Sequence, residues 1–181
     1  MGERVLVGST GFVGGNLMAK GRFTKAYHST DIAQGFGAQN DLVVYAGVPA
    51  AMFLANRDPE ADLAVMRAAR ENLRRLAPKK LVLVSSICVY ADSRGKTEAD
   101  APTLEGLAAY GANRLRLENW VREDRPDALI VRLPALYGLG LKKNFLYDLH
   151  TVTPAMLKTE KYAELAEKSE LVRTGYTDKG N

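Results

Sequence analysis

Short apolar runs alternate with longer amphipathic stretches along most of this sequence. The apolar runs have the length of β-strands and cover residues 5–7, 41–47, 80–85 and 128–133, with a more mixed run at 25–30. The run KLVLVS at 80–85 is apolar on both faces, as a strand inside a parallel sheet requires. Too little chain separates the strands at 25–30 and 41–47 for a helix and a further strand, so we expect the third strand there to be rudimentary or shifted.

Helical periodicity marks the stretches between these runs. Residues 12–20 should form a short helix that ends near Gly21. Asp58 and Pro59 provide an N-cap and a first helical residue, and residues 104–123 form another predicted helix. The helix that begins at Pro59 has a core-facing apolar stripe, formed by Leu63, Met66, Ala69, Leu73 and Leu76. This alternation predicts an α/β fold, a Rossmann-type doubly wound parallel sheet with helices on both faces.

The first strand leads directly into a turn with three evenly spaced glycines. Gly8 lets the chain turn, Gly11 lets the backbone approach a pyrophosphate, and Gly14 lets the following helix lie close to the strand. The free N–H groups of that helix would then face the phosphates. The spacing is G-x-x-G-x-x-G, and a glycine triplet alone also fits a turn without a ligand. Its place after a strand favours a dinucleotide site, to which the intervening residues Thr10, Phe12 and Val13 would also belong.

The end of the second strand bears on which dinucleotide fits. A carboxylate there accepts hydrogen bonds from the ribose hydroxyls and favours NAD, whereas small hydroxyls near an arginine favour NADP. Asp31 lies 20 residues after Gly11 and favours NAD over NADP. Ser29 and Thr30 directly precede it, so an offset of one residue in the strand end would reverse that preference.

Composition narrows the remaining classes of function. The 181 residues carry a net charge of +4 with Lys and Arg dispersed, which does not indicate nucleic-acid binding. No apolar run has the roughly 18 residues of a membrane span, and the chain enters its first strand without room for a signal peptide. The single cysteine, Cys88, fits a reducing cytoplasm. With only His28 and His150 besides it, no metal-ligand cluster is expected.

Two groups of polar residues follow the strands where a doubly wound sheet binds its ligands. Ser85 and Ser86 end the run at 80–85, with Tyr90 four residues beyond Ser86. Tyr110 and Arg114 lie one helical turn apart, so their side chains project from the same helix face.

Together with the glycine turn, these residues resemble the short-chain dehydrogenase/reductase superfamily. They are most similar to its extended branch, the NAD-dependent epimerase/dehydratase family that acts on nucleotide sugars. The matching segments occur in the family's order, over about three-quarters of the chain: GSTGFVGGNL, DLVVYAG, LVSSICVY, YGANRLRLE and IVRLPALYG.

The resemblance implies an enzyme with a catalytic serine at Ser86 and a catalytic tyrosine at Tyr110, and Arg114 stands where the family has lysine. The serine would hold the substrate oxygen while the phenol gives or takes a proton during hydride transfer. Because the phenol of a tyrosine ionises near pH 10, a neighbouring cation is needed to make the phenolate accessible. Arginine supplies that charge but cannot relay a proton, so the site could be active, altered in its chemistry, or a relic that only binds.

The resemblance also assigns the remaining contacts. Ser85 joins the cofactor site, Ala46 and Gly47 match the family's small residues beside adenine and ribose, and Pro134 matches a backbone turn near the carboxamide. The partner would be a small-molecule nucleotide sugar, with a homodimer as a further possibility and no metal.

We expect an NAD(P)-binding domain at residues 1–141 and a partial substrate-side segment at 142–181, with one helix from 154 or 160 to about 171. Because family members usually continue further, the chain is a piece of a longer protein, or its substrate lobe is minimal or comes from another subunit. The basic tail could face a nucleotide diphosphate or form a solvated helix face. The rival interpretations are a dinucleotide sensor without catalysis and a scaffold subunit.

Overall fold

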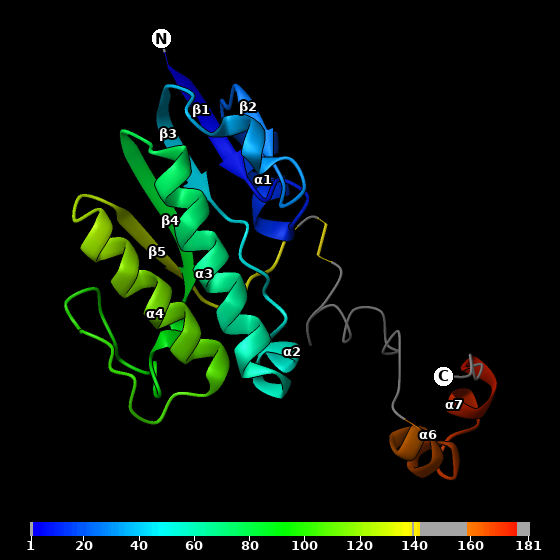
Figure 1. The fold of residues 1–181 in the computed structure, drawn as a ribbon. Helices are drawn as coiled ribbons and strands as arrows, with labels where there is room; N and C mark the ends of the chain where they lie inside the picture. The colour runs from blue at the N-terminus through cyan, green and yellow to red at the C-terminus, as the bar shows by residue number, and fades with distance from the viewer. Residues whose placement is uncertain (1, 139, 142–158, 177–181) are drawn as a thin grey trace. The chain divides into compact units, whose positions relative to one another are not determined.

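The apolar runs form a five-stranded parallel sheet. A computed structural model describes residues 2–138, 140–141 and 159–176 (Figure 1). The strands lie in the order β2-β1-β3-β4-β5. This confirms the predicted Rossmann-type doubly wound arrangement. The strand bounds are β1 Glu3–Val7, β2 Lys25–Tyr27, β3 Asn40–Tyr45, β4 Lys80–Ser86 and β5 Leu129–Leu133.

No strand lies between β2 and β3, where we expected a rudimentary or shifted third strand. Between β2 and β3 the chain forms only the 3-10 turn η1, Ile32–Gly35, before it re-enters the sheet. As a result β3 pairs directly with β1, with Val7 beside Tyr45.

Helices cover the sheet, and α3 (Pro59–Leu76) and α4 (Ala109–Asp124) lie side by side across one face (Figure 1). The chain moves from β1 through α1 (Phe12–Lys20) towards β2, and from β3 through α3 in the opposite direction. Because such crossovers are right-handed, α1 lies on the face opposite to α3.

The core forms between the sheet and the α3–α4 layer. Side chains of alternating strand residues point into it, and α3 contributes most of its predicted stripe. Its fully buried members include Val5, Val43, Met66, Leu76, Leu83 and Leu117.

Two predictions of element bounds were wrong by several residues, and one helix was not predicted. Strand β2 ends at Tyr27 rather than at residue 30, because the chain turns into η1. Helix α4 begins at Ala109 rather than at 104, because Gly106 adopts φ +71° and ends any helical path there. A short helix, α2 (Met52–Arg57), precedes α3 and has no clear periodic signal in the sequence.

The chain divides into two compact units, Met1–Leu136 and Tyr137–Asn181. In the second unit the expected single helix is two, α6 (Thr159–Ala166) and α7 (Glu170–Gly175), because Ser169 is extended between them. The alternative start at residue 154 lies outside the described residues. No helix in the described ranges is long and apolar enough to cross a membrane.

Candidate functional site

The glycine turn between β1 and α1 contains two glycines that the fold itself requires. Gly8 has φ +89°, and a Cβ there would lie 2.6 Å from the carbonyl oxygen of Ala46. A Cβ on Gly14 would lie 2.0 Å from the carbonyl oxygen of Gly8, so α1 can pack against the turn only without a side chain at this position.

Gly11 is different, because no neighbouring protein atom requires it. A Cβ at this position would meet only the Gly8 carbonyl oxygen, at an ordinary contact distance of 3.5 Å. Gly11 is the exposed N-cap of α1, with no side chain capping the helix and no acidic residue in its first turn. The exposed Thr10 and the half-buried Phe12 and Val13 flank it. This open turn at a helix N-terminus without a side-chain cap leaves space for an anionic group such as a pyrophosphate.

His28, rather than Asp31, is the first residue beyond β2. The carboxylate of Asp31 accepts a hydrogen bond from the His28 backbone N–H at 2.5 Å, which closes the turn after the strand. The His28 ring nitrogen Nε2 lies 3.5 Å from the hydroxyl of Ser9 in the glycine turn. Sequence reasoning did not single out His28 or Ser9 for this corner, and the ribose contact of Asp31 remains a prediction.

The small residues after β3 allow the ends of two strands to approach closely. The Ala46 N–H donates to the Val7 carbonyl at 2.9 Å, and a Cβ on Gly47 would lie 2.9 Å from a Val7 methyl group. These contacts explain why both positions are small, whether or not adenine and ribose lie beside them.

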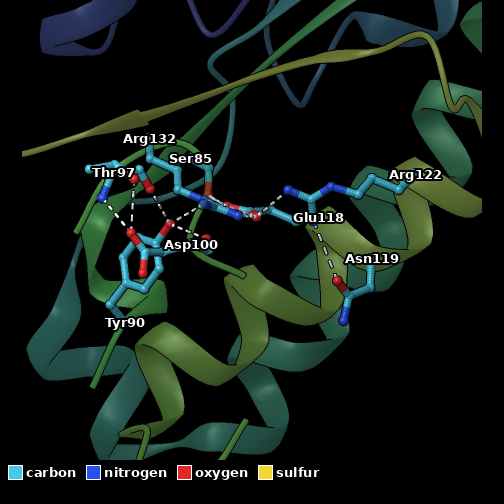
Figure 2. Close-up of polar contacts among 8 residues, drawn as sticks. All are labelled: Ser85, Tyr90, Thr97, Asp100, Glu118, Asn119, Arg122 and Arg132. Carbon is cyan, nitrogen blue, oxygen red and sulfur yellow. Dashed lines mark hydrogen bonds and ion pairs between the residues drawn. The ribbon is translucent and has the colours of Figure 1, made fainter. Parts of the chain in front are cut away.

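Strand β4 carries the two serines, and their hydroxyls make different contacts. The Ser85 hydroxyl donates to the Glu118 carboxylate on α4 at 2.6 Å (Figure 2). The Ser86 hydroxyl accepts a hydrogen bond from the Cys88 N–H at 3.1 Å and caps the η2 turn, Ile87–Val89. The Ser85 hydroxyl therefore faces α4, so a cofactor contact by this residue would have to come from its backbone.

Glu118 is the centre of a buried polar network, and its own charged side chain is 0% exposed (Figure 2). Arg132 on β5 forms an ion pair with it at 2.7 Å, and Arg122 a longer one at 3.2 Å. The hydrogen bond with Glu118 is the main reason that the pKa of Arg132 is raised. Arg132 also donates to the Tyr90 hydroxyl, which in turn donates to the backbone carbonyl of Asp100 at 2.8 Å. The network ties β4, β5, α4 and the loop that contains Asp100 together.

The first turn of α4 presents Tyr110, which is 8% exposed. Its backbone N–H donates to the Asn56 side chain on α2 at 2.9 Å. The next residue, Gly111, packs so closely on the η2 turn that a Cβ would lie 2.0 Å from the Cys88 carbonyl oxygen. This contact brings the turn that follows Ser86 against the start of α4.

Arg114 is buried rather than presented to solvent, at 4% exposure. Its guanidinium carbon lies 3.7 Å from the centre of the Tyr110 ring, the arrangement of a cation–π contact. Nη1 forms an ion pair with Asp62 on α3 at 2.6 Å, and Nη2 donates to the Pro49 carbonyl at 2.6 Å.

The predicted site residues therefore fall into groups at one edge of the sheet. The glycine turn and residues 46–47 follow β1 and β3. Ser86 is the last residue of β4 and the exposed Pro134 follows β5, and these two strands run further beyond that edge. Tyr110 and Arg114 are in contact, but in the described residues no hydrogen bond joins the Ser86 and Tyr110 hydroxyls. No cluster of three metal-ligating side chains occurs in the described part of the chain.

Sequence reasoning missed the two buried carboxylates, Asp62 and Glu118. Glu118 lies eight residues after Tyr110, two helical turns along the same buried face, and a charge on such a face is a detectable signal. Asp62 lies in the first turn of α3, where an acidic residue is common and carries no such signal.

The sequence of residues 5–156 matches the family of the RmlD substrate binding domain. The chain belongs to this family. This match confirms the predicted resemblance to the extended epimerase/dehydratase branch. No curated protein matches the sequence significantly.

Solved structures resemble the chain in fold. A dTDP-4-dehydrorhamnose reductase from Bacillus anthracis, in complex with NADP, shares 18% identity at a TM-score of 0.66, covering 94% of this chain and 62% of that one. RMD from Pseudomonas aeruginosa, complexed with NADPH, shares 20% identity at a TM-score of 0.61, covering 79% and 57%.

A UDP-N-acetylglucosamine 4-epimerase from Bacillus cereus shares 17% identity at a TM-score of 0.59, covering 81% of this chain and 58% of that one. At such identities the likeness establishes the Rossmann-type fold. The chain spans less than two thirds of the length of each of these three proteins.

Proposed function

We propose that this chain binds a nicotinamide dinucleotide and takes part in the reduction or epimerisation of a nucleotide sugar. The observation that carries the proposal is the glycine turn. The fold requires Gly8 and Gly14, whereas Gly11 leaves an open, uncapped helix N-terminus. Such a turn has room for a pyrophosphate and N–H groups that can bind it. The NADP and NADPH complexes of two relatives with this fold support the same cofactor class.

The proposed chemistry uses residues at the same edge of the sheet. The bound dinucleotide would supply or accept a hydride. Ser86 would donate a hydrogen bond from its hydroxyl to the substrate oxygen, and Tyr110 would give or take the proton on that oxygen. Arg114, in contact with the Tyr110 ring, would hold the phenol in place.

Substitution of Gly11 tests the binding half of the proposal. Gly11→Val places a side chain where the pyrophosphate would lie, and we expect about a thirtyfold or greater loss of dinucleotide affinity, roughly 2 kcal/mol. Isothermal titration calorimetry with NAD and NADP measures it. The matched control is Gly15→Val, because a Cβ on Gly15 also meets its nearest neighbour, the Ser9 carbonyl oxygen, at 3.5 Å. Wild-type affinity in a folded Gly11→Val protein would overturn the assignment of this turn.

Substitution of Tyr110 tests the catalytic half. Tyr110→Phe keeps the ring that stacks on Arg114 and removes only the hydroxyl, so turnover should fall by roughly 10²–10⁴-fold while the dinucleotide still binds. The assay follows nicotinamide absorbance with a panel of 4-keto and 4-hydroxy nucleotide sugars. A Tyr110→Phe protein as active as the wild type would end the catalytic assignment. Dinucleotide binding without turnover on any sugar would instead favour a binding or sensor module.

A further inference from the structure

Asp62 contacts the site although it lies far from Tyr110 and Arg114 in the sequence. Its side chain projects from the first turn of α3 and is only 9% exposed. The Oδ2 atom accepts hydrogen bonds from Arg114 Nη1 at 2.6 Å and from the Asn113 side chain at 2.9 Å. One carboxylate oxygen thus binds two successive residues of α4.

These contacts immobilise the guanidinium of Arg114. Nη1 bonds to Asp62 and to the Tyr110 carbonyl at 3.2 Å, and Nη2 bonds to the Pro49 carbonyl at 2.6 Å. With acceptors on α3, on α4 and on the loop after β3, the guanidinium plane can only lie where it does, on the face of the Tyr110 ring.

The charges of this cluster balance as a pair. An arginine cannot lose its proton, so burial of Arg114 without a counter-ion would leave an uncompensated charge in the interior. Asp62 is that counter-ion, and both members of the pair are shielded from solvent. The phenol of Tyr110 therefore lies beside an ion pair with no net charge rather than beside a free cation.

We propose that Asp62 is a positioning residue of the Tyr110 site, which holds Arg114 against the tyrosine ring and offsets its positive charge. The inference rests on the proposed function only in that Tyr110 serves there as the proton carrier. The net charge beside the Tyr110 phenol then depends on residues of two helices, Asp62 on α3 and Arg114 on α4.

The other charged groups on the elements around Tyr110 contact residues other than Tyr110 or are exposed. Arg57, at the end of α2, stacks on Phe53, and Asp58 caps α3 through the Ala61 N–H. Arg116 on α4 donates to Asn113. The further candidates are Glu60 on α3, which is exposed, and Cys88 on η2.

The test is a double-mutant cycle on Asp62 and Arg114. Its readout is the ionisation of the Tyr110 phenol, measured without cofactor or substrate. The tyrosinate absorbance of each protein, minus that of its own Tyr110→Phe version, isolates the ionisation of this phenol across pH. We expect Asp62→Asn to lower the ionisation midpoint by about one pH unit, a tenfold change, because Arg114 becomes an unbalanced cation. Arg114→Met should raise the midpoint, because Asp62 then remains as an unbalanced anion. The double variant, neutral like the native pair, should return close to the wild-type midpoint.

Two controls separate this role from general packing. Asp62→Glu keeps the charge and should keep the wild-type midpoint. Glu60→Gln removes an equal charge from an exposed site on the same turn of α3 and should not move it. If Asp62→Asn alone does not fold, the comparison of Arg114→Met with the double variant carries the test.

An unchanged midpoint in folded Asp62→Asn, or equal midpoints in Arg114→Met and the double variant, would overturn the inference. Failure of the proposed function shows separately, as absence of dinucleotide binding or turnover in the wild type. Where turnover is found, its pH–rate profile should move in the same direction as the midpoint in each variant.

Discussion

Asp31 is the first carboxylate in the sequence after β2 and holds the turn there by accepting a hydrogen bond from the His28 N–H. We predict that Asp31→Ser raises the preference for NADP over NAD by about tenfold, or 1.4 kcal/mol. The reason is that a carboxylate at this position accepts hydrogen bonds from ribose hydroxyls and repels a 2′-phosphate, whereas serine does not repel it. Serine can still accept the His28 N–H, so the turn should persist. Calorimetric titration of both proteins with both dinucleotides measures the ratio.

Asp127→Ser is the control for this change of charge, because Asp127 is an exposed carboxylate that precedes β5, at the amino end of the strand rather than at the carboxyl ends. An equal shift in both variants would mean that only net charge matters. If Asp31→Ser leaves the ratio of NADP to NAD affinity unchanged, Asp31 does not contact the ribose. His28 and Ser9 are then the next residues to substitute.

At the scale of residues, the sequence predicts what local backbone geometry demands. Gly8 and Gly14 are recognisable because a Cβ at either position collides with the chain a few residues away or in the adjacent strand. Asp62 is not recognisable, because its function depends on Arg114, 52 positions further along the chain. The pairing of two buried charges from different helices leaves no periodic signal, so only the fold reveals it.

At the scale of elements, α3 and α4 are joined by an arginine–carboxylate cluster near their C-terminal ends. Arg70 and Arg74 each bind both oxygens of Asp124, at distances of 2.9–3.0 Å. The hydrogen bonds from Arg70 and then Arg74 hold the pKa of Asp124 well below its usual range. A lowered pKa in the folded state means that the cluster stabilises the fold above about pH 4 and loses this effect as the pH falls further.

We therefore predict that Asp124→Asn lowers stability by about 1 kcal/mol at neutral pH, or roughly 2–4 °C in melting temperature. The estimate is modest because Arg74 is 51% exposed and water screens the pair. The difference from wild type should shrink towards pH 3, where the carboxylate of the unfolded chain is protonated. Thermal melts followed by circular dichroism at several pH values measure it.

Asp92→Asn serves as the reference for that experiment, because Asp92 forms an exposed ion pair with its near neighbour Arg94. It should leave the melting temperature unchanged. A constant gap between Asp124→Asn and wild type from neutral to acid pH would contradict the assignment of the effect to charge.

Sequence periodicity is sufficient to predict the bounds of some helices but not of others. Helix α3 begins and ends where its N-cap, proline and apolar stripe predict, because each signal is local. The predicted start of α4 was wrong by five residues, because Gly106 at positive φ competes with the helical pattern of its neighbours. The short α2 is supported by tertiary contact, through Asn56 to the first turn of α4, and periodicity does not predict it.

At the scale of the whole molecule, all the candidate site residues lie in the unit Met1–Leu136. This unit contains the complete five-stranded sheet, the α3–α4 layer and the core between them. The family and the fold could be predicted because several motifs occur in order along this one unit. The substrate contacts could not, because the related structures extend beyond the part that this chain matches.

We predict that a shortened chain ending at Leu136 folds alone and binds NAD and NADP within about threefold of the affinity of residues 1–181. The physical reason is that every hydrogen bond described for the glycine turn, for the His28 corner and for the Arg114 pair is made within that unit. Circular dichroism melts and calorimetry on both proteins measure the two properties, and Gly11→Val should lower the affinity of the shortened chain by the same factor as that of the longer one. A shortened chain that folds but loses the dinucleotide would show that residues 137–181 supply part of the binding site.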